Sequence, residues 1–145
     1  MRRIVALAVL PALLLTLAAV ALAAAPVKGA KYAGSLTISR SETVTFKVSP
    51  SGKKVTHIQV LPFVPNHCGV GGTPPAQRSI PATIVNGKFK ATLNEETSNG
   101  GISGTATVTG KFLAGGKVKG VVKNPLPGAP ECAGNFAYTA KASKG

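Results

Sequence analysis

The chain has 145 residues, with 17 lysine and arginine residues against four acidic ones and a formal net charge of +13. This length predicts a single domain. The acids are all glutamates and there is no tryptophan, which leaves few candidates for sites built on several carboxylates or on an exposed indole platform.

The N-terminus has the three parts of a secretory signal. Arg2 and Arg3 precede an almost wholly apolar run, Ile4 to Leu22, which ends in the small-x-small pattern Ala21-Leu22-Ala23. We expect cleavage after Ala23 and a secreted or cell-envelope location. An uncleaved membrane anchor is the alternative, because about 20 apolar residues can span a bilayer. Removal of residues 1–23 leaves about 122 residues with 15 basic and four acidic side chains, a formal charge of +11.

The cysteines, Cys68 and Cys132, predict one disulfide, since paired cysteines in an exported chain usually oxidise. The bond would close a loop of about 65 residues and stabilise the fold by on the order of 4 kcal/mol. A zinc site is the weaker reading, because His67 alone adjoins a cysteine and zinc takes four ligands. We expect no metal and no cofactor.

After the signal, the sequence predicts short strands separated by turns. β-Branched and polar residues alternate, and Gly, Pro, Asn and Ser mark the breaks. The expected strands are 31–38, 43–49, 55–64, 79–85, 88–93, 104–112, 117–123 and 135–141. About eight such strands are typical of an antiparallel β-sandwich or a small barrel. The expected organisation is a signal peptide at 1–23 containing the only helix, a short linker at 24–30, one β domain at 31–141 and a tail at 142–145.

Two turns and one irregularity stand out along these strands. Pro50-Ser51-Gly52-Lys53 predicts a hairpin between the second and third strands, and Asn86-Gly87 is a strong two-residue hairpin signal. Val55 is out of phase with Ile58, which a bulge near Thr56-His57 would correct. The expected core is Val44, Phe46, Val48, Ile58, Val60, Ile84, Phe89, Leu93, Val108, Phe112, Val118, Val122, Phe136 and Tyr138.

Several segments taken in order resemble a group of small secreted bacterial all-β domains of unassigned function. The segments are Lys31-Tyr32-Ala33-Gly34, the Val44-x-Phe46-x-Val48 hairpin, Asn86-Gly87-Lys88-Phe89, Val108-Thr109-Gly110-Lys111-Phe112 and the closing Phe136-x-Tyr138-Thr139-Ala140. The resemblance implies a sandwich-like fold and an exported location. It carries no catalytic residue over to this chain.

The titratable residues give little support for catalysis. A Ser-His-acid triad needs a poised serine, and the chain has no Gly-x-Ser-x-Gly elbow to expose one. Glu95 and Glu96 are adjacent in an expected loop, which suits a solvated turn better than a carboxylate pair. His57 and His67 read as surface residues. We therefore expect the protein not to be an enzyme.

The lysines are the most informative polar residues. They alternate with core residues at period two, so they project from the opposite face of their strands. The candidate anion-binding residues are Lys88, Lys90, Lys111, Lys117 and Lys119. A basic stripe of this kind attracts anionic polymers, although lysines also block strand-to-strand aggregation and keep a protein soluble. Specific nucleic-acid binding is disfavoured, because exposed aromatic side chains for base stacking are lacking.

The sequence thus predicts a secreted, non-catalytic binding or structural module that contacts anionic cell-envelope polymers through a lysine-rich face. A small-ligand carrier is the first alternative, and it requires an internal barrel cavity of several hundred Å^3. An enzyme is the second, and it requires a cleft that gathers His57 or His67 with a glutamate. The oligomeric state is open.

Overall fold

The computed structural model describes residues 23–61, 76–96, 102–124 and 133–143. They form a nine-stranded antiparallel sheet and no helix. The strands are β1 (Lys31–Leu36), β2 (Ser39–Val48), β3 (Lys54–Leu61), β4 (Ala76–Ser79), β5 (Ala82–Thr83), β6 (Lys88–Glu96), β7 (Ile102–Leu113), β8 (Lys117–Asn124) and β9 (Gly134–Ser143). Among the residues described, no helix has the length and apolar character needed to cross a bilayer.

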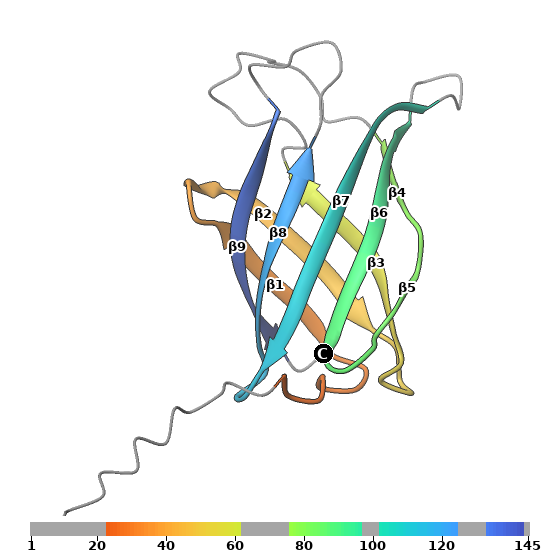
Figure 1. Cartoon of the computed structure of the whole chain (residues 1–145), viewed down its shortest axis with the longest axis vertical. Helices are drawn as coiled ribbons and strands as arrows, with labels where there is room; N and C mark the ends of the chain where they lie inside the picture. The colour runs from red at the N-terminus through yellow and green to blue at the C-terminus, as the bar shows by residue number, and fades with distance from the viewer. Residues whose placement is uncertain (1–22, 62–75, 97–101, 125–132, 144–145) are drawn as a thin grey trace, which may run out of the picture.

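The sheet curls until its two ends meet (Figure 1). The strand order is β4-β6-β7-β8-β9-β1-β2-β3-β5, and the end strands β4 and β5 are separated in sequence by Ile80 and Pro81 alone. Side chains of β4 close the seam against β3. The amide of Gln77 accepts from Val60 N (2.9 Å) and donates to Val60 O (2.6 Å), and Ser79 Oγ accepts from Ile58 N (3.0 Å). Side-chain hydrogen bonds thus satisfy backbone groups of β3 that face β4.

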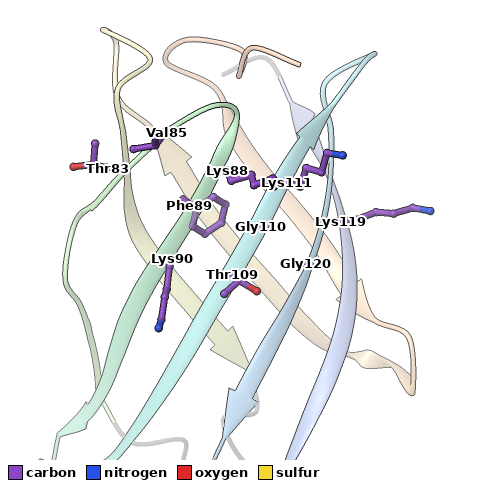
Figure 2. A pocket seen from close by; sticks show the side chains of 10 residues that line it. All are labelled: Thr83, Val85, Lys88, Phe89, Lys90, Thr109, Gly110, Lys111, Lys119 and Gly120. Atoms are coloured by element: carbon purple, nitrogen blue, oxygen red, sulfur yellow. The ribbon is translucent and has the colours of Figure 1, made fainter. Parts of the chain in front are cut away.

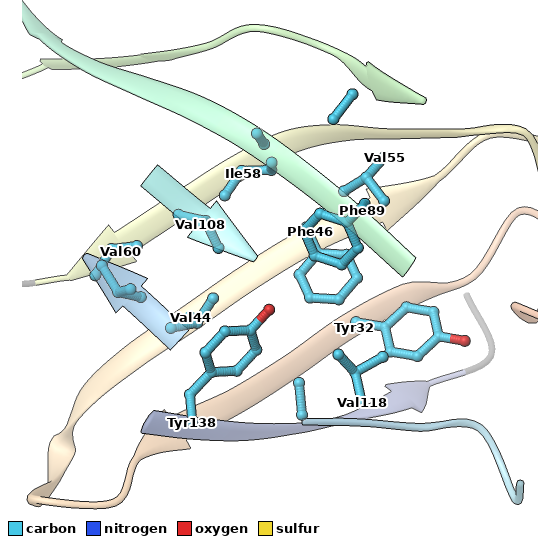
Figure 3. Packing of buried hydrophobic residues seen from close by; sticks show 14 of the residues in the cluster. Tyr32, Val44, Phe46, Val55, Ile58, Val60, Phe89, Val108, Val118 and Tyr138 are labelled. Atoms are coloured by element: carbon cyan, nitrogen blue, oxygen red, sulfur yellow. The ribbon is translucent and has the colours of Figure 1, made fainter. Parts of the chain in front are cut away.

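Aromatic side chains fill the inner face of the curled sheet (Figure 3). The rings of Tyr32 and Phe46 stack with centroids 5.0 Å apart and an interplanar angle of 7°, and Phe112 meets Tyr32 edge-on at 5.5 Å. Phe89 completes the cluster, with its ring centroid 5.3 Å from that of Phe46. These side chains come from β1, β2, β6 and β7, so the cluster joins opposite walls of the sheet. Burial of such rings is the main source of stability in a core of this size.

Glycines on the inner face let the strands approach closely and curl. A Cβ at Gly34 would lie 1.8 Å from Thr139 O, and one at Gly120 would lie 2.0 Å from Thr109 O. Gly110 and Gly120 are register partners, and the ring of Tyr138 lies against Gly120 while its hydroxyl donates to Thr109 O (3.0 Å). Burial raises the pKa of that hydroxyl, because the phenolate would be desolvated. Tyr138 therefore acts as a neutral structural donor that packs into the space left by the glycines.

The all-β, antiparallel prediction is confirmed, and most strand boundaries agree within a few residues. The structure shows one curled sheet where a sandwich would have two. Strand alternation reports which residues face the core, but it does not report whether neighbouring strands belong to one sheet or to two. In place of the expected strand at 79–85, the chain forms two short strands. The first, β4, pairs with β6 and ends at Ser79; after Ile80-Pro81 the second, β5, pairs with β3 at Ala82–Thr83.

The predicted turns and bulge are present. Val85 and Lys88 bridge across Asn86-Gly87, where both residues have positive φ (49° and 66°), as a type I′ turn requires. His57 has a φ of 52°, and the β2–β3 register shifts at this point so that Val55 and Ile58 both face the core. Of the expected core, Ile84 and Phe136 are partly buried and the others are buried. The predicted signal helix and both cysteines lie outside the described residues.

Candidate functional site

The candidate lysines lie on the outer face of three adjacent strands. Lys88 and Lys90 belong to β6, Lys111 to β7, and Lys117 and Lys119 to β8. Each flanks a residue whose side chain is buried, such as Phe89, Phe112 or Val118. Strand alternation therefore turns the lysine side chains outward, as the sequence predicts.

The register of the sheet places several of these lysines directly opposite one another. Lys88 pairs with Lys111, and Lys111 pairs with Lys119, so three neighbouring strands present one row of lysines. Lys117 likewise pairs with Lys141 of β9. Directly opposed side chains have Cβ atoms about 5 Å apart, and like charges in that position are destabilising. Mutual repulsion along this row would be relieved by a bound anion.

A groove of about 670 Å^3 lies along this row (Figure 2). Its lining combines lysines with small or apolar groups: Thr83, Val85, Lys88, Phe89, Lys90, Thr109, Gly110, Lys111, Lys119 and Gly120. The ammonium groups of Lys90, Lys111 and Lys119 point in different directions away from the glycine pair (Figure 2). Gly110 and Gly120 turn their missing side chains toward the core, so they line the groove with backbone between the outward lysines.

Two further hollows continue the groove over the same face. One of about 520 Å^3 shares Lys90 and Thr109 with it and adds Lys123. The other, of about 480 Å^3, shares Lys119 and adds Arg40, Lys117 and Lys141. Because the hollows share lining residues, they form one continuous surface, which we call the lysine face. Its cations are Arg40, Lys88, Lys90, Lys111, Lys117, Lys119, Lys123 and Lys141.

Among the described residues, no acidic side chain lines the lysine face. The sequences of β1, β7, β8 and β9 contain no aspartate or glutamate. Within the described ranges, Glu42 is buried on β2, and Glu95 and Glu96 lie at the end of β6 that is farther from Lys88. Glu96, which is partly exposed, approaches the exposed Arg78 at 4.0 Å, and such a solvent-accessible pair contributes little to stability. The field over the lysine face is therefore of one sign.

The residues considered for other chemistry do not come together. His57 occupies the bulge on β3, where its Nδ1 lies 3.0 Å from Thr56 Oγ1. His67, Cys68, Glu131 and Cys132 lie outside the described residues. In the part of the chain that the structure describes, no three His, Cys, Asp or Glu side chains form a group able to hold a metal ion. The aromatic cluster occupies the interior of the sheet there, so no observation favours the carrier alternative.

Sequence reasoning found the central lysines but missed Arg40 and Lys141. Tyr138 and Ala140 point inward at period two, so the sequence indicates that the next residue, Lys141, points outward. Its position opposite Lys117 depends on β8 and β9 being neighbours, and that pairing is not encoded in local alternation. Arg40 lies at the start of β2, directly after the tight β1–β2 turn, and it joins the lysine face by lining the second hollow.

The opposed lysines make a testable prediction about stability. The change Lys119→Gln is expected to raise the free energy of unfolding by about 0.5 kcal/mol at low salt, because it removes repulsion from Lys111. The gain should shrink at about 500 mM salt, where exposed charges are screened. Chemical denaturation at both salt concentrations measures it. Lys90→Gln is the control, since Lys90 faces Thr109; an equal gain in that variant would show that the opposed pair is not the cause.

Comparison of the chain with family models, with curated proteins and with solved structures found no match.

Proposed function

We propose that this protein is an exported binding module that holds anionic polymers of the cell envelope on its lysine face. The observation that carries the proposal is the row Lys88–Lys111–Lys119, in which like charges are opposed across three strands. Solubility alone is served by lysines placed anywhere on the surface. It gives no reason to oppose them at about 5 Å and to leave the surrounding strands without acids.

The groove favours an extended, repeating polyanion over a compact small ligand. It is open, it continues into two neighbouring hollows, and cations line it along its length. A polymer with a charge at every repeat can contact several lysines in succession, and each contact releases condensed counterions. Thr107 adds a neutral hydroxyl along the same path. The hydroxyls of Thr105 and Thr109 already donate to Asn94 Oδ1 and Val121 O.

Binding of inorganic polyphosphate at several salt concentrations tests the proposal. The logarithm of the binding constant is expected to fall linearly with the logarithm of salt concentration, with a slope near −0.7 to −0.9 for each phosphate contact. Isothermal titration or fluorescence anisotropy between about 50 mM and about 500 mM salt measures the slope. Binding that does not change over this range would contradict an electrostatic site.

A further inference from the structure

One end of the curled sheet is covered by the segment that precedes β1. Ala24 N donates to Phe112 O (2.9 Å), Val27 N donates to Tyr32 Oη (3.0 Å), and Gly29 N donates to Ser49 O (3.2 Å). The segment also packs against three turns. Ala23 lies against Gly87, Val27 against Gly116, and the Lys28 side chain against Gly52. Residues 23–30, which comprise the last residue of the predicted signal peptide and the predicted linker 24–30, therefore form a cap on this end.

Charge is distributed unequally between the two ends. The capped end carries lysines from the cap, from the β2–β3 turn and from strand ends around the whole circumference; they are Lys28, Lys31, Lys47, Lys53, Lys54, Lys88, Lys111, Lys117 and Lys141. We call this the basic end. The acids of the described part lie toward the opposite end, with Glu42 near the start of β2 and Glu95 and Glu96 at the end of β6. Arg40, Arg78 and Lys123 also lie toward that end, so in the described part of the chain the excess positive charge is concentrated at the basic end.

Apolar side chains are also exposed at the basic end. Val27, in the cap, keeps 42% of its surface exposed, and Val85, beside the Asn86-Gly87 turn, keeps 61%. Exposed apolar tips within a field of lysines are typical of surfaces that rest on a bilayer, where the cations meet anionic headgroups and the tips enter the interface.

We infer that the basic end docks onto membranes that contain anionic phospholipids. Charge complementarity carries the inference. The exposed valines add apolar contacts, although Ile38 and Leu61 are similarly exposed at the opposite end. The position of Ala23 adds to it: the predicted signal segment joins the domain at this end, beside Gly87. While that segment is in a bilayer, the basic end is the part of the domain nearest the membrane surface. Lys88, Lys111, Lys117 and Lys141 belong to both surfaces, whereas Lys90, Lys119 and Lys123 of the lysine face lie farther from the docking end and stay available to a polymer.

This inference is separable from the proposed function, because part of the basic end lies away from the lysine face. Lys28, Lys31 and Lys47 line none of the hollows of that face. Lys31 and Lys47 are register partners on β1 and β2, which lie across the sheet from β6 and β7. Changing these three residues removes the same charge as changing Lys88, Lys111 and Lys119, and each set contains opposed lysines.

Vesicle sedimentation with the exported protein tests the inference. Vesicles containing about one third phosphatidylglycerol in phosphatidylcholine should bind the protein, and vesicles of phosphatidylcholine alone should bind it far more weakly. The change Lys28→Gln, Lys31→Gln and Lys47→Gln together is expected to weaken binding to the anionic vesicles on the order of 100-fold. It should leave polyphosphate binding nearly unchanged. Any contribution of the apolar leader is common to both variants and both kinds of vesicle.

The variant in Lys88, Lys111 and Lys119 provides the matched control. It should lose polyphosphate binding and keep more of its affinity for anionic vesicles than the first variant does. A Val27→Ser change should weaken vesicle binding without altering polyphosphate binding. Equal binding to anionic and neutral vesicles, or equal loss in both triple variants, would overturn docking through the basic end. Loss of polyphosphate binding is a separate measurement, so the failure of one proposal does not conceal the failure of the other.

Discussion

Replacing Lys88, Lys111 and Lys119 together with glutamine is expected to weaken polyphosphate binding on the order of 100-fold near physiological salt. Each lysine that meets a phosphate releases counterions, so the loss of three contacts should also lower the steepness of the log–log salt dependence by about 2 to 3. Equilibrium titration of both proteins at several salt concentrations measures the affinity and the slope together. The residues concerned form one row across β6, β7 and β8.

The control for this experiment is the triple glutamine variant at Lys28, Lys31 and Lys47. It makes the same change in net charge and also removes an opposed pair, Lys31 with Lys47. If binding depends on the geometry of the row, this control keeps most of its affinity for polyphosphate. If binding depends on net charge alone, both variants weaken equally, and the lysine face loses its special role.

The change Gly34→Ala is expected to destabilise the domain by about 3 kcal/mol or more, and so to abolish a substantial part of its folding free energy. A Cβ at this position would lie 1.8 Å from Thr139 O and 2.5 Å from Ala140 Cα. Both atoms are backbone, so the strand pair β1–β9 would have to separate locally to accommodate a methyl group. Thermal or chemical denaturation measures the loss.

The matched control is Gly115→Ala, in the β7–β8 turn. Gly115 has a φ of +74°, and a Cβ there would meet no atom within 4 Å. Only the backbone conformation opposes alanine at this site, at a cost of about 1 to 2 kcal/mol. If Gly34→Ala costs no more than Gly115→Ala, then close approach of β1 and β9 is not what requires glycine at position 34.

Much of the fold follows from local sequence, but its closure does not. Alternation predicted the inward direction of Phe46, Val108 and Tyr138, because period two is a property of each strand by itself. The phase break at Val55 predicted the bulge that the structure shows at His57. The single sheet depends instead on pairings between distant segments, such as β1 with β9, and on the crossing of Ile80-Pro81 from β6 to β3. No local pattern reports these pairings.

The lysine face was predictable in composition and not in arrangement. The sequence shows that Lys88, Lys111 and Lys119 point outward. The register that opposes Lys111 to Lys119 follows from the hairpin between β7 and β8, and the one that opposes Lys88 to Lys111 follows from the β6–β7 pairing. The sequence alone could not predict that lysines gather at one end, because this depends on the direction of every strand in the sheet. The basic end therefore became visible only with the topology.

The most direct test of the lysine face is a map of the amide chemical-shift changes that polyphosphate causes in the labelled protein. The largest changes are expected at residues 88–90, 109–111 and 119–120, which line the groove and include the row of opposed lysines. Residues 31–36 and 43–48 should change far less, although Lys31 and Lys47 are there. Changes that are largest on β1 and β2, or that are spread evenly over every lysine, would contradict a binding site on the lysine face.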